Sequence, residues 1–424
     1  MKKRRKSKTG VQAPDGPQQL SLHELVRSSL YDTVLFSGLL YVAQVLEEER
    51  AAVCGPRYRH TESRTAYRAG SVPSSLVLGG RRVVVSRPRV RTREHEEVTL
   101  PSWAEWSATD PLGERAVEQM IVGVSTRDYG RSLEPLPEEV RSRSTGKSSV
   151  SRRFIRGTQR QLEKLVSRSL AELNLIALYL DGVHVSDHVV ITAVGVDATG
   201  KKHVLGLWEG ATEHSATCTA LLEDLVERGL RTDRALLVVI DGSKALRKAV
   251  TAVFGKRALI QRCQEHKKRN VLDALPNDGK RVSVKRALNE AFRTRDVKRA
   301  QKLLDNLIRR LSDDHPGAAE SLKEGLDELL TVKSLGLDEK LERMLSTTNV
   351  IENMIGNVRD VSARVKRWRS GRMVLRWCAA GMLEAERHFR RIKGYDKLKD
   401  LVTELRKHDA KLDGRFTDRA VAAA

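Results

Sequence analysis

The sequence predicts an α/β fold in which a mixed β-sheet is covered by helices and followed by an all-helical insertion. Short apolar runs bounded by turn residues are typical of strands, and they lie at residues 175–180, 188–196, 204–208, 235–240 and 258–261. Two stretches with helical periodicity, around residues 221–229 and 243–254, lie between the last three of these runs. A charged, helix-patterned stretch, residues 271–345, follows the last strand and is expected to form the insertion.

The order of these elements predicts how the sheet is arranged. The first three strands are joined by tight turns, one of them at Asp197-Ala-Thr-Gly200, so they should form an antiparallel meander. The later strands alternate with helices, which gives the order βββαβαβ. This order is like that of ribonuclease H, and in such a fold the first and fourth strands lie side by side.

Two of the predicted strands run directly into an Asp-Gly pair, at Asp181-Gly182 and Asp241-Gly242. The glycines would let the backbone turn away at the strand ends, so both carboxylates are expected at one edge of the sheet. Close carboxylates repel each other unless a divalent cation lies between them. Two Mg²⁺ (or Mn²⁺) ions suit this arrangement, because Mg²⁺ takes few protein oxygens and keeps positions for phosphate and water. Each Asp-Gly pair alone would be explained better as a simple turn.

Phosphodiester chemistry with two metal ions needs a third carboxylate, delivered from a helix against the same edge. Glu352, in the segment Thr347-Thr-Asn-Val-Ile-Glu-Asn353, is the preferred candidate. Asn349 and Glu352 could instead form a helix-capping pair. From the residues alone, Glu342 and Glu265 remain as rivals.

The charge balance of the chain favours a nucleic-acid partner. Of 424 residues, 77 are Lys or Arg and 55 are Asp or Glu, so the formal net charge is +22. Cations of this number suit polyphosphates, since each neutralised phosphate releases condensed counterions. A ribosome-associated or merely very soluble protein is the alternative. Residues 1–20 begin with a basic run that lacks the apolar core of a signal peptide, and they are predicted to be a disordered basic arm.

The N-terminal region is expected to be mostly helical, with one basic hairpin. A capping box at Ser21 and Glu24 predicts the start of a long helix that ends near Cys54. Residues 57–93 are rich in arginine and contain a β-like run broken at Gly79-Gly80, which predicts the hairpin. Residues 101–111 are a candidate linker.

Residues 114–154 have the pattern of three helices separated by short turns. The third helix opens at Lys147 and is basic along one face, which is typical of a helix-turn-helix DNA-binding domain. An ordinary three-helix bundle with a charged face would have the same pattern. Contacts with DNA are expected from this helix, from the hairpin and from the segment after the last strand: Lys147, Arg152, Arg153, Arg156, Arg81, Arg82, Lys267, Lys268 and Arg269.

Several other classes of site are excluded by residue spacing. The cysteines lie far apart in no disulfide or Cys-x-x-Cys pattern, which favours a reducing cytoplasmic compartment, and no apolar stretch is long enough to span a membrane. Cys263 and His266 are too few ligands for a structural zinc site. The segment Ser144-Thr-Gly-Lys-Ser148 resembles a P-loop, but Arg141 stands where the first glycine belongs, so ATP binding is rejected.

A series of different short motifs occurs along most of the chain, from about residue 20 to 395. The motifs are Tyr67-Arg-Ala-Gly70, Gly123-Val-Ser-Thr-Arg127, Leu180-Asp-Gly182, Gly206-Leu-Trp-Glu-Gly210, Val239-Ile-Asp-Gly242, Gln261-Arg-Cys263 with His266 and Arg269-Asn270, Thr347-Thr-Asn349 with Ile351-Glu-Asn353, and Arg367-Trp368 followed by Arg376-Trp377. The ordered set resembles the Mutator-family transposases of bacterial insertion sequences. One departure is Cys218, where many relatives have a tryptophan; it concerns local packing and not the chemistry.

This resemblance implies a ribonuclease-H-like core with a helical insertion between the second aspartate and the glutamate. It also implies that Asp181, Asp241 and Glu352 are the catalytic metal ligands. Cys263 and His266 would have a supporting role without binding metal.

The expected function is therefore that of a DNA transposase. Metal-activated water would cut a strand at each end of the element, and the freed 3′-hydroxyl would attack a phosphodiester, without a covalent intermediate or ATP. The partners would be terminal inverted repeats and target DNA, and pairing of two ends implies a homodimer or higher oligomer. A non-catalytic domesticated DNA-binding regulator and a structure-specific nuclease are the alternatives.

The expected organisation has seven parts. They are a basic arm (1–20), an N-terminal helix and hairpin region (21–112), a helix-turn-helix-like domain (113–170), the first part of the catalytic core (171–272), the helical insertion (273–345), the helical second part of the core (346–395) and a polar helical tail (396–424).

Overall fold

The computed structural model describes residues 30–59, 64–108, 111–210, 214–276 and 278–414. They divide into two compact units, one ending at Gly157 and the other beginning at Thr158. The predicted basic arm and the capping box at Ser21 and Glu24 lie outside the described residues. No helix in the described part of the chain combines the length and the apolar character needed to cross a membrane.

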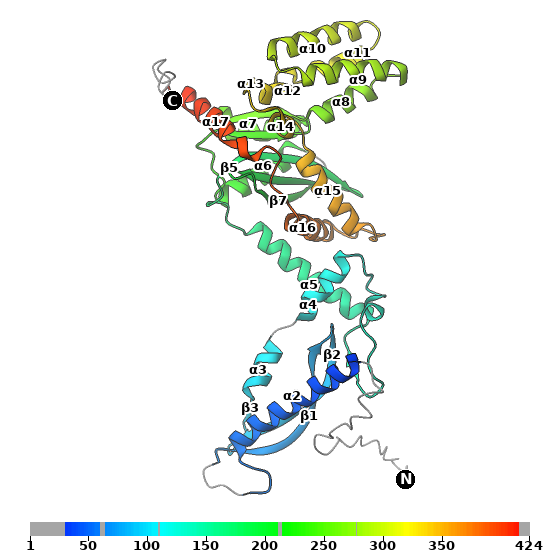
Figure 1. The fold of residues 1–424 in the computed structure, drawn as a ribbon, viewed down its shortest axis with the longest axis vertical. Coiled ribbons are helices and arrows are strands. Elements are labelled where there is room, and N and C mark those ends of the chain that lie inside the picture. The colour runs from blue at the N-terminus through cyan, green and yellow to red at the C-terminus, as the bar shows by residue number, and fades with distance from the viewer. Residues whose placement is uncertain (1–29, 60–63, 109–110, 211–213, 277, 415–424) are drawn as a thin grey trace. The chain divides into compact units, whose positions relative to one another are not determined.

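The second unit is built on a mixed sheet of five strands (Figure 1). The strands are β5 (Leu175–Val185), β6 (His188–Asp197), β7 (Lys202–Gly210), β8 (Leu236–Ile240) and β9 (Ala258–Arg262). Their order across the sheet is β7-β6-β5-β8-β9. Strands β5, β6 and β7 pair antiparallel, whereas β8 and β9 run parallel to β5. The predicted meander and the pairing of the first strand with the fourth are therefore confirmed.

Helices cover both faces of this sheet. They are α6 (Ser215–Glu227), α7 (Lys244–Phe254), α15 (Asn349–Ser362), α16 (Gly371–Arg387) and α17 (Leu398–Leu412). On β5, Leu178 and Leu180 belong to the core that contains α6 and α7. The alternate residues Ala177 and Tyr179 belong to the core that contains α15, α16 and α17. Both faces of β5 are buried, which explains why its sequence is a continuous apolar run.

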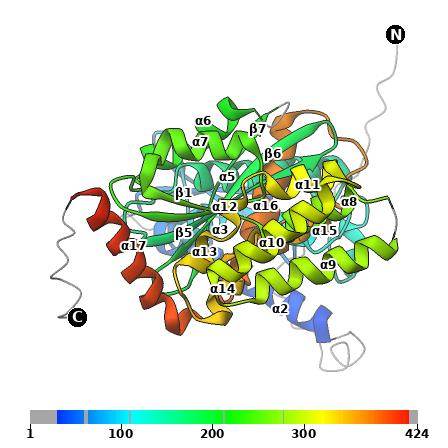
Figure 2. The same ribbon diagram turned by 90° about the horizontal axis from the view of Figure 1, so that it is seen from above.

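The segment between β9 and α15 is all-helical, as predicted. Its helices are α8 (Gln264–Asp273), α9 (Asp278–Arg293), α10 (Val297–Ser312), α11 (Pro316–Lys323), α12 (Leu326–Leu329), α13 (Thr331–Ser334) and α14 (Glu339–Leu345). Leu304, Leu307 and Leu311 repeat at helical spacing on α10 and share a buried core with Val284 and Leu288 of α9. Figure 2 shows α9 and α10 lying side by side.

The first unit contains a long helix against a small sheet. Its elements are α2 (Leu30–Cys54), β1 (Ala66–Leu78), β2 (Arg81–Thr92), β3 (Glu97–Val98), α3 (Pro101–Ala108), α4 (Pro111–Ile121), the 3₁₀ turn η1 (Tyr129–Ser132), β4 (Ser142–Arg143) and the start of α5 (Lys147–Val166). The predicted hairpin is confirmed, since β1 and β2 pair antiparallel around Gly79 and Gly80, which both have positive φ. Leu46 of α2 and Val90 of β2 are fully buried together.

Two predictions for this unit are wrong. The candidate linker at 101–111 is largely helix α3. The middle helix of the predicted helix-turn-helix is only the turn η1, because Ser125 Oγ bonds to Asp128 and to backbone N–H groups and holds a tight turn instead. Tyr129 is buried there and donates its hydroxyl to Gly80 O at 2.9 Å. The segment that follows pairs with the hairpin as strand β4.

Candidate active site

Asp181 and Asp241 lie on neighbouring strands where the pairing of these strands ends. The last parallel partners of β5 and β8 are Leu180 and Ile240, and each aspartate is the next residue. Paired strands lie about 4.8 Å apart. The two carboxylates are therefore attached to neighbouring backbone positions at the C-terminal end of β8.

The two aspartates differ in their backbone, which corrects the prediction that both follow a strand end. Strand β5 continues past Asp181, which pairs with Thr192 of β6. Only β8 ends, and Gly242, with φ of 123°, turns the chain away after Asp241. Asp241 Oδ1 then accepts the N–H of Ser243 at 2.8 Å, one residue before α7 begins. Asp181 is thus held within a strand, and Asp241 in a loop that a helix follows.

Burial and like charge act together on Asp181. Its exposed fraction is 6%, and burial is the main reason why its pKa is raised to about 7. The negative charges of Asp241 and Glu352 raise this pKa further, while His266 lowers it. Asp241 and Glu352 therefore lie close enough to Asp181 to act on its charge. A divalent cation among the three carboxylates would relieve both the desolvation and the repulsion.

Glu352 is supplied by the first turn of α15. Thr348 is the N-cap position of this helix, and its Oγ1 donates to Glu352 Oε1 at 3.0 Å. Asn349 is already the first helical residue, so it does not form the alternative capping pair with Glu352. The hydroxyl of Thr348 instead holds one oxygen of the carboxylate.

The two rival glutamates are engaged elsewhere. Glu342 pairs with the buried Lys333. Glu265 pairs with Lys268 at 2.7 Å and is largely exposed. Glu352, in contrast, is one of the charges that raise the pKa of Asp181.

The Cys-x-x-His pair joins the start of α8 to the start of α15. Cys263 caps α8, and its Sγ accepts the N–H of His266 at 3.4 Å and the N–H of Thr348 at 3.3 Å. His266 Nδ1 lies 3.2 Å from Thr348 Oγ1, and His266 Nε2 lies 3.7 Å from Glu352 Oε1. Through these contacts Thr348, which bonds to Glu352, is connected to α8.

The protonation of His266 gives this network a direction. Its hydrogen bond with Cys263 and the negative charges around it raise the pKa of His266 to about 9, against the effect of burial. At neutral pH both ring nitrogens then carry a proton. Nδ1–H then donates to Thr348 Oγ1, and the hydroxyl of Thr348 has two acceptors within reach, Glu352 Oε1 at 3.0 Å and Cys263 Sγ at 3.3 Å.

Two overlapping sets of side chains could hold a metal ion. The three carboxylates offer hard oxygen ligands, which suit Mg²⁺ or Mn²⁺. Cys263, His266 and Glu352 form a second set, whose possible ligand atoms all lie within 4.8 Å of one another and whose sulfur and nitrogen would suit zinc. The buried Cys263 sulfur already accepts two N–H groups, which counts against zinc in this second set.

The residues predicted to contact DNA separate into buried and accessible groups. Arg81, Arg153 and Lys267 are less than a tenth exposed. Arg81 donates to Glu134 O, and Arg153 Nη1 donates to Ser144 O at 3.0 Å.

Lys267 Nζ donates to backbone carbonyls, one of them Glu324 O at 2.8 Å. These three side chains bond within the fold, which counts against their prediction as DNA contacts. The other predicted contacts are at least partly exposed: Lys147, Arg152, Arg156, Arg82, Lys268 and Arg269.

Thr348 is the site residue that the sequence interpretation missed. It lies four residues before Glu352 and therefore on the same side of the helix start. This spacing was a usable signal, but a threonine in a Thr-Thr-Asn segment is explained equally well as an ordinary helix cap.

Comparison with known proteins identifies the family. The model of the family described as "Transposase, Mutator family" matches residues 23–391. The chain belongs to the Mutator family of transposases.

The curated relatives are transposases of bacterial insertion sequences. The one for IS406 of Burkholderia multivorans is 28% identical over 322 residues, which cover 74% of this chain and 80% of the relative. The one for IS256 in transposon Tn4001 of Staphylococcus aureus is 26% identical, with 80% of this chain and 86% of the relative covered. The one for IS1081 of Mycobacterium tuberculosis is 26% identical, with 89% of each chain covered. The resemblance inferred from the motifs is thereby confirmed.

Proposed function

We propose that this Mutator-family member is an active insertion-sequence transposase that cuts and joins DNA strands at the edge of its mixed sheet. The observation that carries the proposal is the approach of Asp181, Asp241 and Glu352 to one another, with Asp181 buried and its pKa raised. The strand order β7-β6-β5-β8-β9 supports a ribonuclease-H-like interpretation of the core. The names of the relatives, which are transposases for insertion sequence elements, support DNA as the substrate.

Each element would hold one part of the metal site. Asp181 and Asp241 would bind from neighbouring strands and Glu352 from α15. When bound, Mg²⁺ or Mn²⁺ ions polarise the phosphate and make water or a 3′-hydroxyl a stronger nucleophile. Thr348 keeps one Glu352 oxygen oriented, and His266 completes the hydrogen-bond chain behind it. A complex that joins two DNA ends needs at least two copies of the chain.

The test is strand cleavage of terminal-repeat DNA in Mg²⁺ by the full-length protein and by Asp181→Asn, Asp241→Asn and Glu352→Gln. Each variant should cut at least roughly a hundredfold more slowly, because several kcal/mol of transition-state stabilisation are lost. Glu223→Gln, at an exposed position of α6, is the matched control and should cut at the wild-type rate.

Three outcomes would decide against parts of the proposal. Full activity in any one carboxylate variant removes that residue from the site. Tight binding of terminal repeats by the wild-type protein without any Mg²⁺-dependent cleavage favours the non-catalytic regulator. Cleavage of branched DNA without a requirement for terminal repeats, and without strand joining, favours the structure-specific nuclease.

A further inference from the structure

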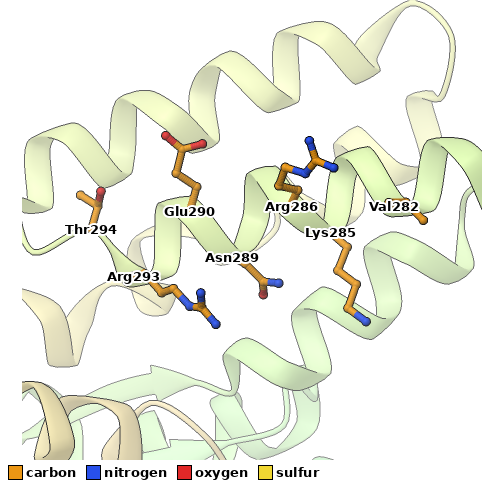
Figure 3. Close-up of a pocket in the computed structure, with 7 residues that line it drawn as sticks. All are labelled: Val282, Lys285, Arg286, Asn289, Glu290, Arg293 and Thr294. Atoms are coloured by element: carbon orange, nitrogen blue, oxygen red, sulfur yellow. The ribbon is translucent and has the colours of Figure 1, made fainter.

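A hollow lies along one helix of the insertion, outside the candidate active site (Figure 3). Its volume is about 640 Å³. It is lined by Val282, Lys285, Arg286, Asn289, Glu290, Arg293 and Thr294. Apart from Thr294, which directly follows the helix, these residues belong to α9 and recur at intervals of three and four, so they form one continuous stripe.

The charge of this stripe is mainly positive. Lys285, Arg286 and Arg293 are exposed, and Glu290 is the one acidic lining residue. Figure 3 shows Lys285, Asn289 and Arg293 pointing to one side of α9, whereas Arg286 and Glu290 point to the other. The cationic side therefore carries Lys285 and Arg293 without an acidic lining residue beside them.

The fold of the insertion does not require these cations. The residues of α9 that fill the insertion core are Val284, Leu288 and Ala291, which alternate with the lining residues along the helix. Arg286 lies four residues before Glu290 on its side of α9, whereas Lys285 and Arg293 lie on the other side, where no acidic residue lines the hollow. Lys285 and Arg293 therefore offer two exposed cations to an anionic partner on this side.

Helix α8 connects this stripe to the candidate active site. Lys268 Nζ on α8 donates to Asn289 Oδ1 at 3.0 Å. Lys268 lies two residues after His266, which contacts Thr348 and approaches Glu352. The hollow therefore lies beside α8, the helix whose start borders the carboxylates.

We propose that the α9 hollow binds the phosphodiester backbone of a DNA strand that enters or leaves the active site. Lys285 and Arg293 are eight residues apart, so they are separated by about 12 Å along the helix. Phosphates of one strand rise about 3.4 Å each, so this span can accommodate several of them. Contacts of this kind add affinity without reading sequence. The inference rests on the proposed function, because it takes DNA as the substrate.

The test measures binding of fluorescent terminal-repeat DNA against salt concentration by the full-length triple variant Lys285→Gln/Arg286→Gln/Arg293→Gln. Its matched control removes the same charge from exposed positions of α10, which do not line the hollow: Lys298→Gln/Lys302→Gln/Arg309→Gln. For the α9 variant, the slope of log affinity against log salt should become shallower by about 2, since each phosphate contact contributes about 0.7 to 0.9. Affinity at low salt should fall by roughly tenfold or more. The control should keep the wild-type slope.

The readout separates this inference from the proposed chemistry. The same slopes are measured with the metal-site variant Asp241→Asn as background, so a loss of slope there supports the hollow even if no strand is cut. An unchanged slope in the α9 variant, or an equal loss in the α10 control, overturns the inference while leaving cleavage intact.

If the triple variant does not fold, Arg293→Gln alone should reduce the slope by close to one, and an unchanged slope overturns the inference. The inference would also be overturned if the substitutions released an acidic protein segment from the α9 hollow and left DNA binding unchanged.

Discussion

The carboxylates at the sheet edge and the basic residues of the first unit were both predicted from the sequence, but their surroundings in the structure differ. Asp181, Asp241 and Glu352 come from distant parts of the chain and act on one another electrostatically. Among the arginines expected to face DNA, Arg81 and Arg153 are instead buried and bonded to backbone carbonyls. The positions of Asp181 and Asp241 followed from strand register, whereas charge alone did not show which basic residues are buried.

The difference has a physical cause. A residue that directly follows a parallel strand pair has its position set by the backbone, before any side-chain choice is made. An arginine has a long flexible stem and five donors, so it can bury its stem and reach a carbonyl in its own fold as readily as a phosphate outside it. A segment rich in arginine is therefore only partial evidence for a DNA partner, because some of its arginines bond within the fold.

The largest expected effect is the pH dependence of the folding stability of the metal-free protein. A carboxyl whose pKa is about 7 when folded and near 4 when unfolded binds its proton more tightly in the folded state. Asp181 should therefore destabilise the folded protein increasingly as pH rises from about 4 to about 7, by up to about 4 kcal/mol. The measurement is the melting temperature against pH, with the difference between wild type and Asp181→Asn isolating this group.

Added Mn²⁺ should reverse the loss near pH 7 in the wild type and have less effect in Asp181→Asn. If the two proteins show the same pH dependence without metal, Asp181 does not titrate in this range, and the electrostatic reason for a cation at this edge fails.

A second effect concerns Thr348, whose hydroxyl holds Glu352. Thr348→Val keeps the shape but removes a hydrogen bond to a charged group, which contributes about 1.5–3 kcal/mol. Cleavage should slow roughly tenfold or more, with a higher Mg²⁺ concentration needed for half-maximal rate. Thr348→Ser keeps the hydroxyl and should restore most of the rate.

A purely structural role for Thr348 would lower the melting temperature and leave the Mg²⁺ requirement unchanged. Equal rates for the valine and serine variants would show that the hydroxyl does not position Glu352.

The smallest effect distinguishes buried from exposed arginines in neighbouring positions of α5. Arg153→Gln removes the donor to Ser144 O and to Ser149 Oγ, so it should destabilise the first unit by about 1–3 kcal/mol. Arg152→Gln, at an exposed position, should leave the melting temperature unchanged and make the salt slope of DNA binding shallower by about one. Circular dichroism and fluorescence anisotropy measure the two quantities. The reverse pattern would restore Arg153 as a DNA contact.

Local patterns were sufficient for much of the second unit. Five apolar runs predicted the strands, and the βββαβαβ order predicted that β5 and β8 are neighbours, which the register of Leu180 with Ile240 confirms. The end of β5 was not predictable in this way, because residues beyond Asp181 continue the strand only by pairing with β6. The middle helix expected near Ser125 is replaced by a tight turn that Ser125 Oγ holds locally and that the Tyr129 hydroxyl ties to Gly80 of the hairpin.

The sequence by itself determined the apolar strands, the all-helical insertion and the family, because each depends on residues close together in the chain or on ordered motifs. Only the tertiary structure decided which arginines are buried, that Thr348 connects Cys263 and His266 to Glu352, and that the cationic stripe of α9 begins beside α8. These depend on partners far away in the chain, and a hydrogen bond with such a partner forms only after the elements have packed.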